Sequence, residues 1–179
     1  MSIDKKNRQV FGFVPARMAA SRFPGKPLYN ILGRPMLEHC FERAKLYRDW
    51  DYLAIATCDQ EIKQFSISKS YNLIMTSDAH TRALDRVAEA VEVCQKPIKD
   101  DDIVVCVQGD EPLLGPDIIK LIVNPLINDS NINGTILAVP ILDQESFLNP
   151  DTVKLVHNRD FDVLYTSRSP IPYTKKFSA

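Results

Sequence analysis

Short β-rich runs alternate with amphipathic helical stretches along nearly the whole chain, and this alternation constrains the fold more than any other feature. The strand-like runs span residues 10–16, 52–57, 72–77, 102–108, 134–141, 153–158 and 163–167, and the helix-like stretches span residues 35–47, 60–70, 82–95 and 116–127. Alternation of this kind produces βαβ units with right-handed crossovers. The sequence therefore predicts an α/β fold with a mostly parallel sheet.

The strongest strand run, "DIVVCVQ" at 102–108, is apolar nearly throughout, as expected of a strand that is covered on both faces. In open α/β sheets, ligands bind beyond the carboxyl ends of the strands. The segments that follow four of the strand runs are "RMAASRFPGKPL", "SDAHTRALDR", "QGDEP" and "SRSPIP". All of them are rich in charged and polar side chains, so we expect the functional site there.

Length and composition exclude several classes of protein. The 179 residues carry a formal net charge of −1, so the chain lacks the excess positive charge that would indicate a nucleic-acid or membrane partner. No apolar run approaches the ~20 residues of a membrane-spanning helix, and the first nine residues lack the apolar region of a signal peptide. The cysteines, which are Cys40, Cys58, Cys94 and Cys106, form no CxxC pair. We therefore expect a cytoplasmic protein with reduced thiols and no zinc site.

The first candidate site is the segment "PARMAASRFPGKPL" at 15–28, which places Arg17, Arg22 and Lys26 directly after an apolar run. Cations on a backbone that contains Gly25 can surround a phosphate with charge and with N–H groups. The segment is neither a GxxxxGK[ST] loop nor a GxGxxG loop, so it signals neither a P-loop NTPase nor a dinucleotide fold. A solvated loop that serves solubility explains the same residues, and charge alone leaves this alternative open.

The second candidate is "VQGDEP" at 107–112, in which Asp110 and Glu111 follow a buried strand. A carboxylate at a strand end suits Mg²⁺, which takes few protein oxygens and shares the others with water and substrate phosphates. From spacing alone, a turn-capping Asp110 and a solvated Glu111 are an equal alternative. A cationic loop and an acidic loop at neighbouring strand ends together predict phosphate-ester chemistry with little need for a protein nucleophile.

The motifs "PARMAASRFPGKPL", "VQGDEP", "LAVPI", "NPDTVKLV" and "SRSPIP" occur in order between residues 10 and 173. Together they resemble the 3-deoxy-manno-octulosonate (Kdo) cytidylyltransferases, also called CMP-Kdo synthetases, of the sugar-nucleotidyltransferase superfamily. The resemblance implies a Rossmann-like three-layer sandwich with a mostly parallel central sheet, of the nucleotide-diphospho-sugar transferase type. It also implies transfer of CMP from CTP to Kdo or a similar 2-keto sugar acid, with release of pyrophosphate, for lipopolysaccharide biosynthesis.

The same resemblance implies roles for individual residues. Lys26, Asp110 and Arg17 would be catalytic, and Asp110 would bind Mg²⁺. The residues implied at the nucleotide are Ala16, Arg17, Ser21, Arg22, Lys26, His80, Arg86 and Gln108, of which Arg17, Arg22 and Lys26 would hold the phosphates. Arg168 would face the sugar acid, with Ser167 and Tyr173 close by. An arginine there makes physical sense, because a guanidinium pairs with a carboxylate through two hydrogen bonds.

One departure from the family pattern concerns substrate choice. The family reads H-x-S-G-T-[DE]-R after the third strand, whereas this chain reads "HTRALDR", with Arg82, Ala83 and Leu84 at the Ser, Gly and Thr positions. Arg82 adds bulk and charge where the family has a small residue. It motivates the alternative of a related nucleotidyltransferase for another acid sugar or another nucleotide. A surface arginine on the first turn of a helix is the simpler explanation.

The other departure is length. Members of this family continue beyond the point where this chain ends, and their additional part carries a further Mg²⁺-binding aspartate, sugar-binding side chains and the main dimer contacts. We therefore expect residues 1–179 to form a single nucleotidyltransferase domain without the C-terminal part, and the full-length family form to be a homodimer. The alternative to an enzyme is an incomplete or inactive nucleotide-binding module.

Overall fold

The computed structural model describes residues 8–19 and 23–177. These residues form two compact units, which are divided between Thr135 and Ile136. The elements of the first unit are β1 (Val10–Pro15), η1 (Lys26–Leu28), β2 (Asn30–Ile31), β3 (Arg34–Pro35), α1 (Met36–Ala44), β4 (Tyr52–Thr57), α2 (Gln60–Ser68), β5 (Leu73–Met75), α3 (Ala83–Glu92), β6 (Ile103–Cys106) and α4 (Pro116–Asn128). The strands and helices expected in this unit are confirmed, and the short η1, β2 and β3 are additions to them.

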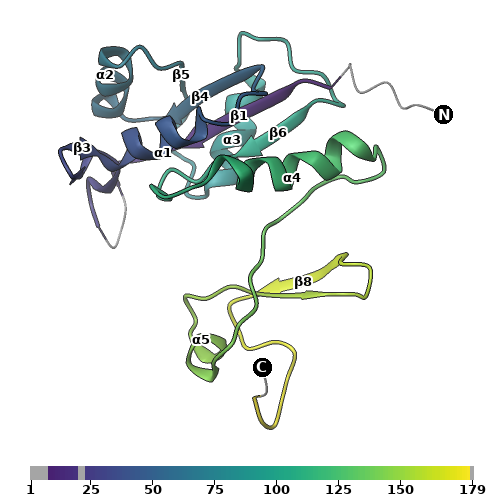
Figure 1. Cartoon of the computed structure of the whole chain (residues 1–179). Helices are drawn as coiled ribbons and strands as arrows, with labels where there is room; N and C mark the ends of the chain where they lie inside the picture. Colours follow the sequence, from purple (N-terminus) through teal and green to yellow (C-terminus); the bar gives the residue numbers. More distant parts are fainter. Residues whose placement is uncertain (1–7, 20–22, 178–179) are drawn as a thin grey trace. The chain divides into compact units, whose positions relative to one another are not determined.

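The central sheet has the strand order β5-β4-β1-β6, and all of its pairings are parallel (Figure 1). Strand β1 lies between β4 and β6, so that Phe11 is in register with Tyr52 on one side and with Val104 on the other. The crossovers β1-α1-β4 and β4-α2-β5 are the βαβ units that the alternation predicted. The α/β class with a parallel central sheet is therefore confirmed.

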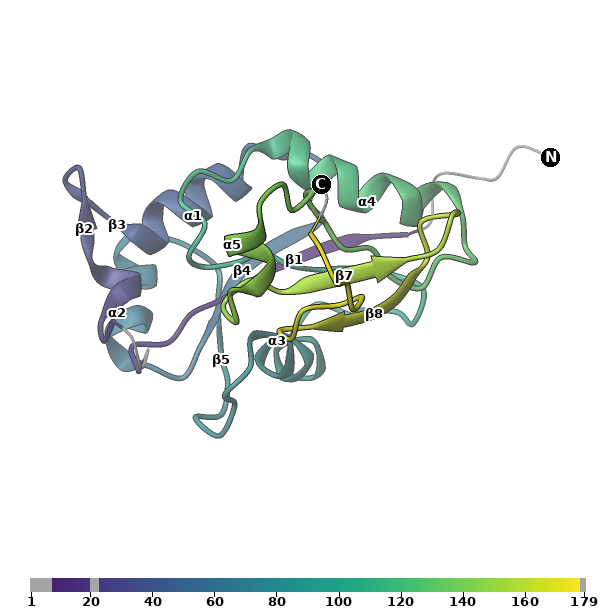
Figure 2. The same cartoon turned by 90° about the horizontal axis from the view of Figure 1, so that it is seen from below.

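The first unit has three layers. On one face of the sheet, residues of α1, α2 and α4 such as Leu37, Ile62 and Val123 pack with Val14 in one hydrophobic cluster. On the other face, α3 packs against the residues Phe11, Phe13, Ala54, Ala56 and Ile74. Figure 2 shows α1 and α4 on one side of β1 and α3 on the other. Burial on both faces explains why β1 and β4 are apolar at almost every position. The expectation that the run at 102–108 is covered on both faces is wrong in part, because β6 is an edge strand and its Val104 is exposed.

The second unit contains α5 (Gln144–Leu148) and the antiparallel pair β7 (Lys154–His157) and β8 (Val163–Ser167), which were expected as strands. Asp143 caps α5 by accepting a hydrogen bond from the Ser146 amide at 2.7 Å. The buried ammonium of Lys154 donates to the carbonyls of Asn149 and Thr152 at 2.7 and 2.8 Å. These contacts fix the start of α5 and the turn that leads from α5 into β7.

The strand expected at 134–141 is wrong. This segment belongs to none of the sheets that the structure describes, although Ile136, Leu137 and Val139 have the β-favouring side chains that suggested it. A strand needs a hydrogen-bonded neighbour as well as a favourable sequence. Pro140 also removes one of the donors that a ladder would use.

The four cysteines of the chain are free thiols, of which Cys40 is buried and the others are half-buried. Burial, and in smaller part the charge of Asp110, raises the pKa of the Cys40 thiol to about 11. Burial alone raises the pKa of the Cys106 thiol to about 11. Both groups are therefore protonated, weak nucleophiles at neutral pH. As to membranes, no helix within residues 8–19 and 23–177 has the length and apolar character needed to span one.

Candidate functional site

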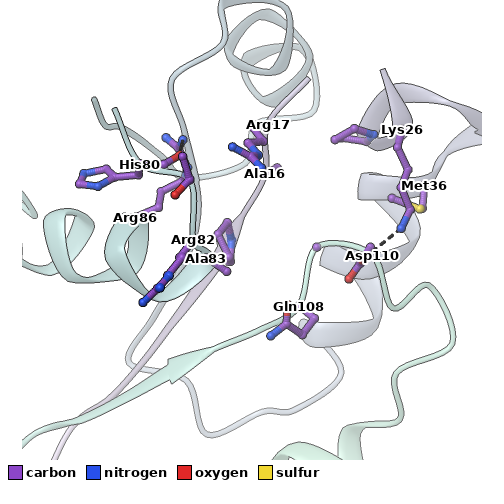
Figure 3. A pocket seen from close by; sticks show the side chains of 14 residues that line it. Ala16, Arg17, Lys26, Met36, His80, Arg82, Ala83, Arg86, Gln108 and Asp110 are labelled. Carbon is purple, nitrogen blue, oxygen red and sulfur yellow. Dashed lines mark hydrogen bonds and ion pairs between the residues drawn. The ribbon is translucent and has the colours of Figure 1, made fainter. Parts of the chain in front are cut away.

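A pocket of about 220 Å³ opens where β1, β5 and β6 end (Figure 3). Its walls come from three loops and from the starts of α1 and α3. The lining residues are Pro15, Ala16, Arg17, Lys26, Pro27, Met36, His80, Thr81, Arg82, Ala83, Arg86, Gln108, Gly109 and Asp110. The carboxyl ends of parallel strands are where open α/β sheets bind their ligands. The pocket therefore lies where the strand pattern predicted the site.

Most of the site residues expected in the first unit line this one pocket. They are Ala16, Arg17, Lys26, His80, Arg86, Gln108 and Asp110. Ser21 and Arg22, which were expected at the nucleotide, lie outside the described residues. The structure thus brings together segments that are up to 94 residues apart, counted from Ala16 to Asp110 (110 − 16). Their individual roles stay predictions.

The first loop, which follows β1, folds back on itself. The Ala16 amide still donates to the carbonyl of Ala56 in the sheet at 2.9 Å. Further along the loop, the Gly25 amide donates to the Met18 carbonyl at 2.9 Å. Gly25 has a φ of 75°, which glycine adopts without steric cost. The carboxylate of Asp59 accepts a hydrogen bond from the Met18 amide at 2.8 Å. These bonds fix the two ends of the loop that carries the cations.

The loop after β6 approaches the first loop very closely. A Cβ atom on Gly109 would lie 2.5 Å from the carbonyl oxygen of Pro15, so this position accepts only glycine without a backbone shift. Nearby, the Lys26 ammonium lies 2.9 Å from Oδ2 of Asp110. Arg43 of α1 donates to the carbonyl of Leu114 and holds the far end of the same loop. The cationic and acidic loops are therefore in direct contact.

The loop between β5 and α3 is organised by Arg86, which is only 2% exposed. Its Nη1 donates to Oγ1 of Thr76 and, at 3.0 Å, to the carbonyl of Ser77, while its Nη2 donates to the carbonyl of His80 at 3.2 Å. The guanidinium of this α3 residue thus has three partners in the loop that precedes the helix. The structure gives Arg86 a part in shaping this wall, and its expected contact with the nucleotide stays a prediction.

The ring of His80 is directed away from Lys26 and Asp110 in Figure 3. Its Nε2 is paired with the carboxylate of Glu89 on α3. Both oxygens of that carboxylate also accept from the Ser77 amide, at 2.8 and 3.0 Å. His80 therefore contributes to the pocket mainly through its backbone and its place in the loop.

The pocket has a cationic lining, with Arg17, Lys26, Arg82 and Arg86 beside the carboxylate of Asp110. Clustered guanidinium and ammonium groups favour a multiply charged anion such as an oligophosphate. Arg82 was singled out only as a departure from a family pattern, and the structure places it in the wall. The residue is exposed and precedes α3 in extended backbone, with φ −105° and ψ 146°.

The residues expected at the sugar acid all lie in the second unit. Arg168 donates to the carbonyl of Pro150 at 2.9 Å and lies 3.6 Å from Oδ1 of Asp151. The hydroxyl oxygen of Ser167 accepts from the Ser169 amide at 3.0 Å, and Tyr173 is 85% exposed. Ser167 and Arg168 are neighbours at the end of β8, and the role of all three residues stays a prediction.

Sequence reasoning missed the residues that hold the three loops, which are Asp59, Arg43 and Glu89. Asp59 precedes α2 and has the position of a helix cap, but its carboxylate serves the first loop instead. Glu89 follows Arg86 by three residues, a spacing that puts both side chains on one helix face. That spacing was the one available signal, and it could not reveal the Ser77 and His80 contacts.

A parallel sheet with a cationic pocket at its carboxyl strand ends defines the structural class of open α/β proteins. Within that class, the model of the cytidylyltransferase family matches residues 11–179. The chain therefore belongs to the cytidylyltransferase family. This match spans both compact units of the structure.

The resemblance to the Kdo cytidylyltransferases is also confirmed. The chain is 40% identical over 162 residues to the 3-deoxy-manno-octulosonate cytidylyltransferase of Syntrophus aciditrophicus, and the match covers 90% of this chain and 64% of that protein. The enzyme of the same name from Haemophilus influenzae is 42% identical, with 90% and 62% covered. The chain thus spans less than two thirds of the length of these curated relatives.

Solved structures agree on the fold. A CMP:2-keto-3-deoxy-manno-octonic acid synthetase complexed with CTP superposes with a TM-score of 0.79 at 32% identity, and the match covers 93% of this chain and 67% of that one. A 4-diphosphocytidyl-2C-methyl-D-erythritol synthase gives a TM-score of 0.60 at 17% identity, which concerns the fold alone. The expected sandwich of the nucleotide-diphospho-sugar transferase type is confirmed.

Proposed function

We propose that this protein acts in the transfer of CMP from CTP to Kdo or a similar 2-keto sugar acid, with release of pyrophosphate, for lipopolysaccharide biosynthesis. The observation that carries the proposal is the cationic pocket at the strand ends, in a chain about 40% identical to Kdo cytidylyltransferases. In this reaction the anomeric hydroxyl of the sugar attacks the α-phosphorus of CTP. A new oxygen–phosphorus bond forms, and the bond to the leaving pyrophosphate breaks.

Arg17 and Lys26 would hold the triphosphate in this proposal, together with Arg22. Their contribution is to orient the α-phosphate and to balance the charge that develops on pyrophosphate as it leaves. Ala16, Ser21, His80, Arg86 and Gln108 would complete the nucleotide site. Gln108 is exposed in the pocket wall, where its amide can donate to or accept from a base.

The residues present fit a magnesium ion held through Asp110. Its carboxylate is 54% exposed beside Lys26, and Glu111 follows it. The described part of the chain shows no cluster of three or more His, Cys, Asp or Glu side chains that could hold a metal, so water and phosphate oxygens would complete the coordination. Cytidylyltransferases generally use a divalent metal, and when bound it would neutralise charge on the reacting phosphates.

Arg168 would bind the carboxylate of the sugar acid, with Ser167 and Tyr173 nearby. In the structure Arg168 is exposed, and its guanidinium is held by Pro150 and Asp151, so it is available for a second, bidentate partner. The homodimer, the cytoplasmic location and the single domain over residues 1–179 stay predictions that accompany this function.

Pyrophosphate release tests the proposal. The protein is incubated with Mg²⁺, CTP and Kdo, and parallel reactions replace Kdo with another 2-keto sugar acid or CTP with another nucleotide. We expect release with CTP and Kdo, and we expect Lys26→Ala and Asp110→Asn to suppress it. Lys120→Ala and Asp117→Asn, on the exposed part of α4, are the matched controls.

A second candidate is a related nucleotidyltransferase for another acid sugar or nucleotide, and the position of Arg82 in the pocket wall favours it. Turnover with a different sugar acid or nucleotide, and none with CTP and Kdo, would select this candidate. Binding of CTP without turnover would select an incomplete or inactive nucleotide-binding module.

A further inference from the structure

The carboxylate of Glu89 does not line the pocket, yet it makes the contacts that hold one of the pocket walls. Glu89 lies in the second turn of α3, and its side chain is 25% exposed. Both of its oxygens accept from the Ser77 amide, at 2.8 and 3.0 Å, and Oε2 is also paired with Nε2 of His80. One side chain therefore binds both ends of the segment that runs from Ser77 to His80.

The wall beyond this segment consists of the residues His80, Thr81, Arg82 and Ala83. Residues 76–82 lie between the end of β5 and the start of α3 and contain no helix or strand, so their course depends on individual hydrogen bonds. Ser77 Oγ accepts from the Ala79 amide at 3.1 Å, and Arg86 donates to the carbonyls of Ser77 and His80. Arg86 thus satisfies two carbonyls of this loop, while Glu89 accepts from the Ser77 amide and pairs with the His80 ring.

Charge makes the Glu89 contacts strong. Hydrogen bonds to an ionised carboxylate are shorter and stronger than those between neutral groups. The Ser77 amide, then the neighbouring His80 and Arg86, outweigh partial desolvation and lower the pKa of Glu89 below its usual value. The carboxylate is therefore ionised at neutral pH and can only accept hydrogen bonds, which requires a proton on Nε2 of His80.

We propose that Glu89 is a positioning residue for the nucleotide site, which acts by fixing the 77–82 loop through Ser77 and His80. This inference rests on the proposed function, because it takes the pocket to be the place where CTP binds. Glu89 itself touches no substrate. Its carboxylate sets the place of His80, Thr81 and Arg82 in the wall and the orientation of the His80 ring.

Two variants and one control test the proposal. Glu89→Ala removes all of the contacts, and Glu89→Gln keeps the shape while replacing one acceptor by an NH₂ donor. Glu92→Gln, an exposed residue in the last turn of the same helix, removes an equal charge and serves as the control. Amide hydrogen exchange of residues 76–83 and the affinity for CTP with Mg²⁺ are measured for each protein.

We expect Glu89→Ala to accelerate exchange of the Ser77 amide at least about tenfold and to weaken CTP binding about tenfold, the size expected when hydrogen bonds to a charged acceptor are lost. Glu92→Gln should change neither quantity. Unchanged exchange in Glu89→Ala would overturn the claim that this carboxylate holds the loop. Faster exchange with unchanged CTP affinity would overturn the positioning role.

The Glu89→Gln variant separates the hydrogen bonds of this side chain from its charge. Its amide oxygen can accept from the Ser77 amide while its NH₂ group donates to a ring nitrogen of His80, so it can hold both ends of the loop without a charge. Glu89→Gln should therefore recover most of the CTP affinity that Glu89→Ala loses.

A CTP affinity of Glu89→Gln as low as that of Glu89→Ala would contradict a role that acts through the hydrogen bonds to Ser77 and His80. If the parent itself binds no CTP, the proposed function fails and the positioning role fails with it. The exchange measurement then still decides whether Glu89 holds the loop. The two failures are thereby distinguished.

Discussion

The ammonium of Lys26 and the carboxylate of Asp110 lie 2.9 Å apart and join the loop after β1 to the loop after β6. The two side chains are 36% and 54% exposed, so the pair adds little to the stability of the fold. The pair matters for the position of its groups, because it holds the cation expected to bind phosphate beside the carboxylate expected to bind the metal. In the proposed reaction this ion pair would be replaced, because Lys26 would pair with the triphosphate and Asp110 with the metal.

Lys26→Ala is expected to weaken CTP binding by about tenfold to a hundredfold, since a charge-assisted hydrogen bond to phosphate is worth about 1.5–3 kcal/mol. The free energy of unfolding should change by less than about 1 kcal/mol, because the pair is exposed. Calorimetric titration and denaturant unfolding measure the two quantities. Equal CTP affinity in Lys26→Ala and in the Lys120→Ala control would contradict the phosphate role.

Asp110→Asn keeps an oxygen that can accept from Lys26 but removes the charge that a metal needs. We expect a large loss of pyrophosphate release while much of the CTP affinity is retained, because the metal acts mainly on charge that develops during the reaction. Comparing turnover with calorimetric affinity in the same preparation separates the two effects. Parent-like turnover would remove Asp110 from the metal site.

Gly109→Ala tests the close approach of the two loops. The added Cβ would lie 2.5 Å from the Pro15 carbonyl oxygen, so the backbone must move, at a cost of about 1–3 kcal/mol. For a chain of this length each kcal/mol lowers the melting temperature by about 2–4 °C. We expect a lower melting temperature together with weaker CTP binding.

Gly134→Ala is the matched control for this substitution, since a Cβ there meets nothing within 4 Å. It should leave both the melting temperature and the CTP affinity unchanged. If the two alanine variants behaved alike, the contact between Gly109 and Pro15 would have no part in shaping the site.

Asp59→Ala is expected to loosen the first loop, because the Met18 amide loses its acceptor at 2.8 Å. Exchange of that amide should accelerate, and CTP affinity should fall several-fold, in line with one lost hydrogen bond to a charged group. Asp59→Asn retains a carbonyl oxygen and should restore most of the affinity. No difference in CTP affinity between Ala, Asn and the parent would show that the loop holds its course without Asp59.

Thiol reactivity gives a prediction about pH. Because the pKa values of Cys40 and Cys106 are raised to about 11, about one thiol in a thousand is ionised at pH 8. Alkylation of these residues by iodoacetamide, followed by mass spectrometry, should be slow at pH 8 and should accelerate about tenfold per pH unit up to pH 10. Rates at pH 8 that equal those of the unfolded chain would contradict the burial of these thiols.

Much of the fold could be predicted from the sequence, since the inner strands β1 and β4 are buried on both faces and their apolar runs are therefore continuous. The loop residues Arg17, Lys26, Gln108 and Asp110 could be placed in one site, because parallel strands bring their carboxyl ends to the same sheet edge. In both cases a local pattern in the sequence follows directly from a rule of α/β architecture.

What could not be predicted depends on partners far along the chain. The run at 134–141 has the composition of a strand, but pairing decides whether it becomes one. Asp59, Arg43 and Glu89 hold the loops by bonding to backbone amides and carbonyls. Because every residue offers such backbone groups, the sequence does not indicate which of them each side chain contacts. Arg86 was expected at the nucleotide, and its burial and its bonds to Thr76 and Ser77 became visible only in the structure.

In the proposed function, the pocket between the loops after β1, β5 and β6 binds CTP. Calorimetric titration of the protein with CTP, with and without Mg²⁺ and with ATP, GTP and UTP as controls, tests it most directly. We predict selective binding of CTP that Mg²⁺ strengthens and that Lys26→Ala weakens. Absence of binding to every triphosphate, or equal binding of all four, would contradict a cytidine nucleotide site in this chain.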